Sequence, residues 1–385
     1  MTFALDTIAG YSEQLVKIRH DLHMHPELGF EEERTAGVVA SLLASWGIEV
    51  HTGIGKTGVV GVLRGRDGMR SIGLRAELDA LPIEEATNLE YRSHRPGVFH
   101  GCGHDGHMTI LLGAARYLAE TKNFSGNAIF IFQPAEEGRG GARAMLADRL
   151  FERFPCNEIY ALHNAPGGPR GRVMLRPGAA MAAADFFDVT VTGRGAHAAE
   201  PQNSIDPIAA AVAFAQAAQT ILSRNVDPLK SAVVSITRLV SGTAYNVIPD
   251  AAEMSGTIRT FDHDIRALVA RRMREIGEGV AAAFDAQVTV DIRDCFSVLE
   301  NWPEQTAAAA AIAAEAFGAD NVDAAARPQL ASEDFADMLK VVPGAYLWFG
   351  QSEGPALHNP SYVFDDGIIP LGASMLANLV ERRSS

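Results

Sequence analysis

The order of strand-like and helix-like patterns between residues 185 and 294 constrains the fold of this chain most. An alternating run, D-F-F-D-V-T-V-T-G, precedes a helical segment that begins with Asp206 as N-cap and Pro207 at the first helical position. Two strand-like runs, S-A-V-V-S-I-T-R-L-V and A-E-M-S-G-T-I-R-T, come next, then a helix with one apolar face and a last strand, A-Q-V-T-V-D-I. This βαββαβ order predicts a ferredoxin-like domain.

The flanking segments alternate short apolar runs with helical patterns. The strand-like runs are T-G-V-V-G-V-L-R, S-I-G-L-R-A-E-L, N-A-I-F-I-F-Q-P, E-I-Y-A-L-H and G-A-Y-L-W-F-G, and the helical patterns cover residues 5–25, 33–46, 105–120, 304–317 and the chain from about 371. Such alternation predicts an α/β domain with a mostly parallel sheet covered on both faces. We therefore expect a discontinuous first domain, residues 1–184 and 295–385, with residues 185–294 inserted into it.

Composition narrows the class of protein and of ligand. An apolar fraction of 47% with 21% charged residues is typical of a globular protein. The formal net charge of -14 argues against nucleic acid or an anionic membrane as partner, because both require a basic surface. No window resembles a membrane span or a signal peptide, and the three cysteines do not form a disulfide pattern. We expect a cytoplasmic protein with reduced cysteines that acts on a small molecule.

The densest group of reactive side chains is the segment H-G-C-G-H-D-G-H, residues 100–107. Cys102 and His104 are two residues apart, so that both side chains of an extended segment point to the same side. A helix beginning near Asp105 would place its N-terminus beside Cys102, which lowers a thiol pKa. By itself, the segment is compatible with packing, oxidation, nucleophilic attack or metal binding.

Further ligand candidates follow strand-like runs at distant positions. They are Asp79, Glu136, Glu137, His163 and His358. Because ligand sites of open α/β sheets lie outside the carboxyl ends of strands, we expect these residues to converge. A set of Cys, His and carboxylate ligands suits zinc, nickel, cobalt or manganese.

The adjacent pair Glu136 and Glu137 permits a division of labour, in which one carboxylate binds metal and its neighbour takes a proton from water. Such pairs also occur as solvated surface. A Cys-His nucleophile is the rival interpretation of Cys102, but it leaves these two carboxylates, His163 and His358 without a task. Amide or ester hydrolysis by activated water accounts for all of them.

In this order along the chain, the motifs resemble the aminoacylase, hippurate hydrolase and auxin-conjugate amidohydrolase family of metallopeptidases. The matching motifs are H-x-H-P-E, R-A-E-L-D-A-L-P, H-G-C-G-H-D-G-H, Q-P-A-E-E-G, A-L-H-N, G-A-H-A-A-x-P, N-V-I-P-D, G-T-I-R-T, S-E-D-F and L-H-N-P. The resemblance implies a zinc-peptidase-like catalytic domain holding two divalent ions (zinc, manganese, nickel or cobalt), and an inserted lid or dimerisation domain. A homodimer through this lid domain is expected.

The resemblance also implies a role for each matching residue. Cys102 would bridge the two ions, His104, Glu137, His163 and His358 would complete their ligand sets, and Glu136 would be the general base. Asp79 would orient a ligand. His197 would stabilise the tetrahedral intermediate, and Asn246 and Arg259 would bind the substrate carboxylate or carbonyl, for which a guanidinium is well suited.

Two positions depart from the family pattern: Glu77 stands where aspartate is usual, and Gln202 where histidine is common. We predict a metal-dependent amidohydrolase that cleaves N-acyl amino acids, of hippurate or N-acetyl type, to a carboxylate and a free amino acid. The alternatives are a dipeptidase or aminopeptidase of the same family, and a non-catalytic protein that binds metal or amino-acid conjugates. On the predicted lid helix, a smooth face of Ala210, Ala213, Ala217 and Ile221 is either a subunit contact or core.

Overall fold

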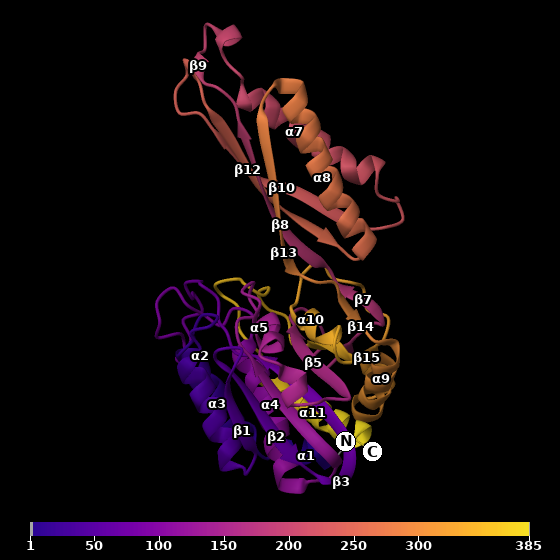
Figure 1. Ribbon diagram of the computed structural model, residues 1–385. Coiled ribbons are helices and arrows are strands. Elements are labelled where there is room, and N and C mark those ends of the chain that lie inside the picture. Colours follow the sequence, from indigo (N-terminus) through magenta and orange to yellow (C-terminus); the bar gives the residue numbers. More distant parts are fainter. Residues whose placement is uncertain (1–2, 385) are drawn as a thin grey trace. The chain divides into compact units, whose positions relative to one another are not determined.

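A computed structural model describes residues 3–384, which divide into two units with separate hydrophobic cores (Figure 1). The first unit contains residues 3–180, 300–327 and 333–384, and the second contains Met181–Leu299 and Pro328–Ser332. Two of the four divisions fall within short strands that pair with each other, β7 (Gly178–Met181) and β14 (Leu299–Asn301), rather than after residues 184 and 294; the other two flank Pro328–Ser332. Residues 1, 2 and 385 of the predicted first domain lie outside the described residues.

An eight-stranded sheet forms the centre of the first unit, in the order β1-β2-β4-β3-β5-β16-β6-β15. Its strands are β1 (Glu49–Ile54), β2 (Gly58–Arg64), β3 (Arg66–Glu77), β4 (Ser125–Gln133), β5 (Glu158–Ala165), β6 (Val173–Met174), β15 (Val322–Asp323) and β16 (Gly344–Gly350). Strand β3 runs parallel to β4 and β5, and β5 runs parallel to β16. Strands β5 and β16 are buried along nearly their whole length, which explains the apolar runs I-Y-A-L and A-Y-L-W-F within them. The predicted α/β class is confirmed.

Helices of the first unit pack around this sheet. They are α1 (Phe3–Ala9), α2 (Ser12–Met24), α3 (Glu33–Ser45), α4 (His104–Thr121), α5 (Gly141–Ala147), α6 (Leu150–Arg153), α9 (Pro303–Phe317), α10 (Phe335–Leu339) and α11 (Ile369–Arg383). The helix predicted over residues 5–25 is in fact two helices, because the chain turns where Gly10 N bonds to Thr7 O at 3.1 Å. Hydrophobic periodicity continues across the turn, so the sequence pattern did not reveal it.

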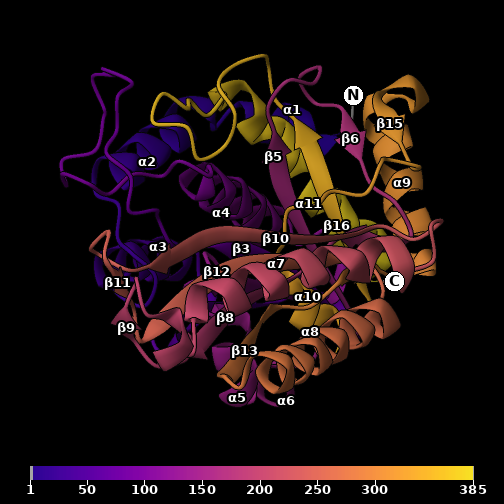
Figure 2. The ribbon, with the colours of Figure 1, turned by 90° about the horizontal axis from the view of Figure 1, so that it is seen from above.

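The second unit is a four-stranded antiparallel sheet with two helices, α7 (Pro207–Arg224) and α8 (His263–Phe284), side by side on one face (Figures 1 and 2). The sheet order is β10-β12-β8-β13, formed by β8 (Ala183–Thr192), β10 (Ala232–Ser241), β12 (Ala251–Thr260) and β13 (Gln287–Phe296). The predicted βαββαβ order is confirmed. Asp206 caps α7 by accepting hydrogen bonds from Ile208 N and Ala209 N, at 2.9 and 3.3 Å.

The core of the second unit lies between this sheet and helices α7 and α8. Phe214 of α7 is fully buried there beside Phe187 and Met254. Ala210 and Ile221 belong to the same core, so this part of the smooth helix face packs inside its own unit. Within residues 3–384, no helix has the length and apolar character needed to cross a membrane.

Replacing Phe214 by alanine should destabilise the second unit strongly. Phe214 is 0% exposed, and a Phe→Ala substitution in a core lowers the free energy of unfolding by about 3–5 kcal/mol. Val212→Ala on the same helix is the matched control, because Val212 is 53% exposed and surface changes are usually worth less than about 0.5 kcal/mol. Urea denaturation followed by circular dichroism would measure both, and equal losses would contradict this account of the core.

Candidate metal centre

The carboxyl ends of strands β3, β4 and β5 lie next to one another. Glu77 at the end of β3 pairs with Gln133 at the end of β4, and Arg75 pairs with Ala161 of β5. Asp79 and the Glu136–Glu137 pair follow β3 and β4, and His163 lies near the end of β5, so all of them lie at one edge of the sheet. The start of helix α4 brings Cys102 and His104 to the same place.

Two groups of potential metal ligands meet at this edge and share one residue. One group is Cys102, His104 and His163, and the other is Cys102, Glu137 and His358; within each group the ligand atoms lie within 4.8 Å of one another. Cys102 Sγ is 3.3 Å from His163 Nε2, and His358 Nε2 is 3.3 Å from Glu137 Oε1. The Cys102 sulfur therefore belongs to both groups.

The donor atoms at this edge fit a divalent cation. His104 turns Nδ1 toward Asp79, 2.8 Å from its carbonyl oxygen and 3.4 Å from Oδ1, while its buried Nε2 has no hydrogen-bond partner among the described residues. A metal-binding histidine commonly donates its second ring nitrogen to a carbonyl or carboxylate in this way. Burial lowers the pKa of His104, but Asp79 and the charge of Glu77 raise it to about 10, so a cation would displace a proton.

The thiol of Cys102 does not behave as the helix N-terminus alone predicted. Burial raises the pKa of Cys102 well above its usual value, and the charges of Glu137 and Glu136 raise it further. Helix α4 begins at His104, two residues after this thiol. Because a metal binds the thiolate, positive charge at the site would have to offset the surrounding carboxylates.

A fully buried guanidinium, that of Arg75, lies beside the carboxylates. Arg75 donates to Gln133 Oε1 at 2.9 Å, to Glu333 Oε1 at 2.8 Å and to Asp334 Oδ1 at 3.1 Å, and it also pairs with Glu77. Sequence reasoning gave Arg75, Glu333 and Asp334 no role. The available signal was an arginine next to the apolar run I-G-L of this strand, because a buried charge requires partners.

Glu136 adjoins this buried network. Its carboxylate lies within 4.8 Å of those of Glu333 and Asp334. Burial raises the pKa of Glu136 well above its usual value, and the charges of Glu333 and Glu137 act in the same direction. Burial likewise raises the pKa of Asp334, to about 8, against the opposing effect of Arg75.

The two departures from the family pattern have different surroundings. Glu77 is fully buried, and its Oε2 lies 2.8 Å from His107 Nδ1. His107 Nε2 in turn lies 2.7 Å from Asn164 Oδ1, so Glu77 and Asn164 hold the imidazole from both sides. Gln202 is exposed in a short 3-10 turn, Pro201–Asn203.

Two further side chains of the H-G-C-G-H-D-G-H segment are buried. Asp105 accepts a hydrogen bond from Arg19 at 3.1 Å and lies 2.8 Å from His23 Nδ1, which ties α2 to the start of α4. His100 has no hydrogen-bond partner among the described residues for either ring nitrogen. Burial lowers the pKa of His100 to about 4, so its ring is neutral at physiological pH.

His197, Asn246 and Arg259 belong to the second unit. His197 ends the short strand β9 (Ala196–His197), which pairs with β11 (Val247–Ile248), and Ala198 N donates to Asn246 O at 3.0 Å. His197 and Asn246 therefore lie close together and are both exposed. Arg259 lies in strand β12, half-buried, and donates to the carbonyl of Ile258 at 3.1 Å.

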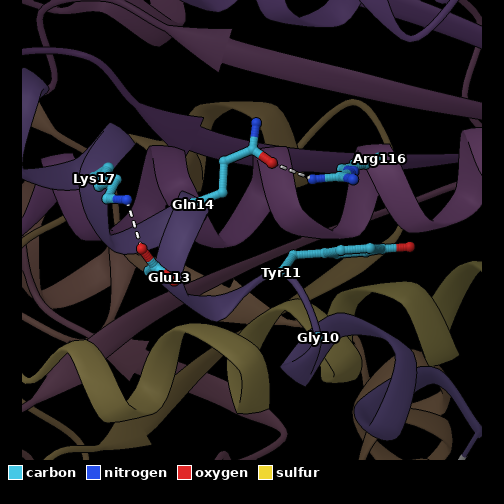
Figure 3. A pocket seen from close by; sticks show the side chains of 6 residues that line it. All are labelled: Gly10, Tyr11, Glu13, Gln14, Lys17 and Arg116. Carbon is cyan, nitrogen blue, oxygen red and sulfur yellow. Dashed lines mark hydrogen bonds and ion pairs between the residues drawn. The ribbon is translucent and has the colours of Figure 1, made fainter.

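A separate surface hollow of about 340 Å³ lies between α2 and α4 (Figure 3). Its cationic groups already have partners: Lys17 pairs with Glu13 at 2.5 Å, and Arg116 donates to Gln14 at 2.7 Å. The Arg116 guanidinium also lies over the Tyr11 ring, 3.9 Å from its centre. The hollow thus differs from the candidate metal centre, where His104 Nε2 is buried and has no hydrogen-bond partner within residues 3–384.

Known proteins share both the sequence and the fold. Residues 73–382 match the model of peptidase family M20/M25/M40. The chain is 45% identical to hippurate hydrolase of Campylobacter jejuni over 363 residues, 94% of each chain, and 38% identical to N-acetylcysteine deacetylase of Bacillus subtilis over 96% of this chain and 97% of that one.

A solved structure of a Bacillus subtilis protein, described as a dinuclear metal binding peptidase from the M20 family, superposes with a TM-score of 0.85. It is 34% identical in sequence, and the match covers 98% of this chain and 99% of that one. The resemblance inferred from the motifs is therefore confirmed. The chain belongs to peptidase family M20/M25/M40, as a metal-dependent amidohydrolase.

Proposed function

We propose that this enzyme hydrolyses the amide bond of N-acyl amino acids, of hippurate or N-acetyl type, to a carboxylate and a free amino acid. The observation that carries the proposal is Glu136 beside two ligand groups that share Cys102. The names of the relatives support the substrate class, because one is a hippurate hydrolase and another an N-acetylcysteine deacetylase.

In the proposed mechanism, Cys102, His104, Glu137, His163 and His358 hold two divalent ions (zinc, manganese, nickel or cobalt). When bound, such ions act as Lewis acids that polarise the amide carbonyl and make water more acidic. Glu136 takes a proton from the attacking water as the new carbon–oxygen bond forms. It then gives this proton to the departing nitrogen as the carbon–nitrogen bond breaks. Asp79 holds His104 by its Nδ1 side and leaves Nε2 for the ion.

Residues of the second unit complete the proposal. We assign His197 to the stabilisation of the tetrahedral intermediate, and Asn246 and Arg259 to the substrate carboxylate or carbonyl. We also propose a homodimer through this unit. Strand β10 is at an edge of its sheet and exposes Leu239 and Val240, by 46% and 49%, and an apolar sheet edge favours pairing with another chain.

Glu136→Gln should retain bound metal and lose hydrolysis by about a hundredfold or more, because glutamine keeps the shape but cannot accept the proton. Steady-state kinetics and elemental analysis of the same preparation would measure both effects. Glu137→Gln is the matched comparison and should lose metal as well as activity. An active Glu136→Gln enzyme would refute the role of Glu136.

Cys102→Ala should lose bound metal, since the sulfur belongs to both ligand groups. Elemental analysis after dialysis would measure the number of ions per chain. Cys295→Ala is the control, because Cys295 is a half-buried thiol of the second unit and belongs to neither ligand group. Full metal occupancy in Cys102→Ala would contradict the bridging assignment.

A substrate panel tests the reaction class. The metal-loaded enzyme should turn over hippurate or N-acetyl amino acids with a higher kcat/KM than free dipeptides, because none of the proposed roles is recognition of the free α-amine that a dipeptide carries. The reverse order would identify a dipeptidase or aminopeptidase. Absence of turnover across the panel despite full metal loading would indicate a binding protein.

A further inference from the structure

The residue before the general base has a strained backbone. Ala135 has φ of 54°, in the left-handed region that residues with a Cβ avoid. It directly precedes Glu136 and Glu137, so its conformation sets the direction in which both carboxylates leave the backbone. Such strain persists only where the surrounding structure enforces it.

One buried carboxylate holds this strained residue. Glu32 is 0% exposed, and its Oε1 accepts a hydrogen bond from Ala135 N at 2.8 Å. Its other oxygen, Oε2, accepts from the hydroxyl of Thr57 at 2.6 Å. The two oxygens of a single side chain thus have separate partners, one at the strained residue and one in the turn between β1 and β2.

The backbone next to Glu32 also lies against the loop that carries Glu136. A Cβ at Gly29 would lie 3.0 Å from both Cα and Cβ of Ala135, so this position has no room for a side chain unless Ala135 moves. Arg139 donates to the carbonyl of Gly29 at 2.9 Å. Residues 29–32 therefore support the left-handed turn by contact as well as by a hydrogen bond.

We propose that Glu32 is a positioning residue for hydrolysis. By holding the N–H of Ala135, it keeps Ala135 in the left-handed conformation that directs Glu136 to the water and Glu137 to the metal. The inference rests on the proposed functions of Glu136 and Glu137. Gly29 and Glu32 lie outside the family match of residues 73–382, so that match gives them no role.

The test compares variants that keep or remove the side-chain oxygen of residue 32 that accepts the hydrogen bond from Ala135 N. Glu32→Met removes it at similar side-chain length, and Glu32→Gln keeps an amide oxygen there while its NH₂ can donate to Thr57. We expect Glu32→Met to lower kcat between about tenfold and a hundredfold, since displacing a catalytic group by about 1 Å can cost that much. KM should change little, and Glu32→Gln should restore most of the lost kcat.

Thr57→Val is the matched control for structural support, because it removes the other hydrogen bond to the same carboxylate. We expect its kcat to match wild type even where its thermal midpoint falls as far as that of Glu32→Met. Equal loss of kcat in Thr57→Val and Glu32→Met would overturn the proposal. A Glu32→Gln enzyme as impaired as Glu32→Met would overturn it as well.

If Glu32→Met does not fold, a second pair of variants tests whether the support of Ala135 affects kcat. Gly29→Ala would press on Ala135, whereas Gly37→Ala in helix α3 would meet no atom within 4 Å. Gly29→Ala should lower kcat and Gly37→Ala should not; equal kcat in the two would overturn the proposal.

Glu136→Gln, measured in parallel, distinguishes failure of the proposed function from failure of the proposed role of Glu32. Activity in Glu136→Gln would refute the proposed function itself. An inactive Glu136→Gln together with a fully active Glu32→Met would refute only the role of Glu32.

Discussion

The burial of several carboxyl groups is the constraint on which the first unit depends. Five carboxyl-bearing residues at the edge of its sheet are at most 6% exposed: Glu77, Asp79, Glu136, Glu333 and Asp334. A buried charge is costly unless it is paired and hydrogen-bonded. Arg75 neutralises part of this cluster, and His104 and His107 lie within it. Among the described residues, His104 Nε2 has no hydrogen-bond partner, and an imidazole nitrogen suits a divalent cation such as zinc.

Strain at the same edge has a related cause. Ala135 and His358 both have left-handed backbone conformations, with φ of 54° and 64°, and both lie in segments that carry proposed metal ligands. Hydrogen bonds from the protein interior hold these turns: Ala135 N to Glu32, and His358 N to Gly101 O at 2.8 Å. The Glu137 N–H is held in the same way, by Asp79 Oδ2 at 3.0 Å. Glu32 and Asp79 thus hold the backbone N–H groups of Ala135 and Glu137, on either side of Glu136.

Prediction from sequence succeeded for features that depend on neighbouring residues, and for the placement of residues that follow strands. The N-cap at Asp206 and the βαββαβ order are local patterns, and the structure has both. Glu137, His163 and His358 were expected to converge from their positions after strands, and their ligand atoms lie in groups that include Cys102. The break at Gly10 was missed because apolar spacing continues across it. The raised pKa of Cys102 was missed because it results from burial and from carboxylates that are distant in sequence.

The sequence by itself determined the two fold types, the family and the residue types suited to a metal-dependent hydrolase. These depend on hydrophobic periodicity and on the order of the motifs, and both can be read from the linear sequence. Only the tertiary structure decided which side chains share a ligand group, how Arg75 neutralises Glu333 and Asp334, and that Glu32 contacts Ala135. The physical reason is that these interactions join residues as many as 259 positions apart, and a buried charge or an unpaired N–H can be identified only once the chain has folded around it.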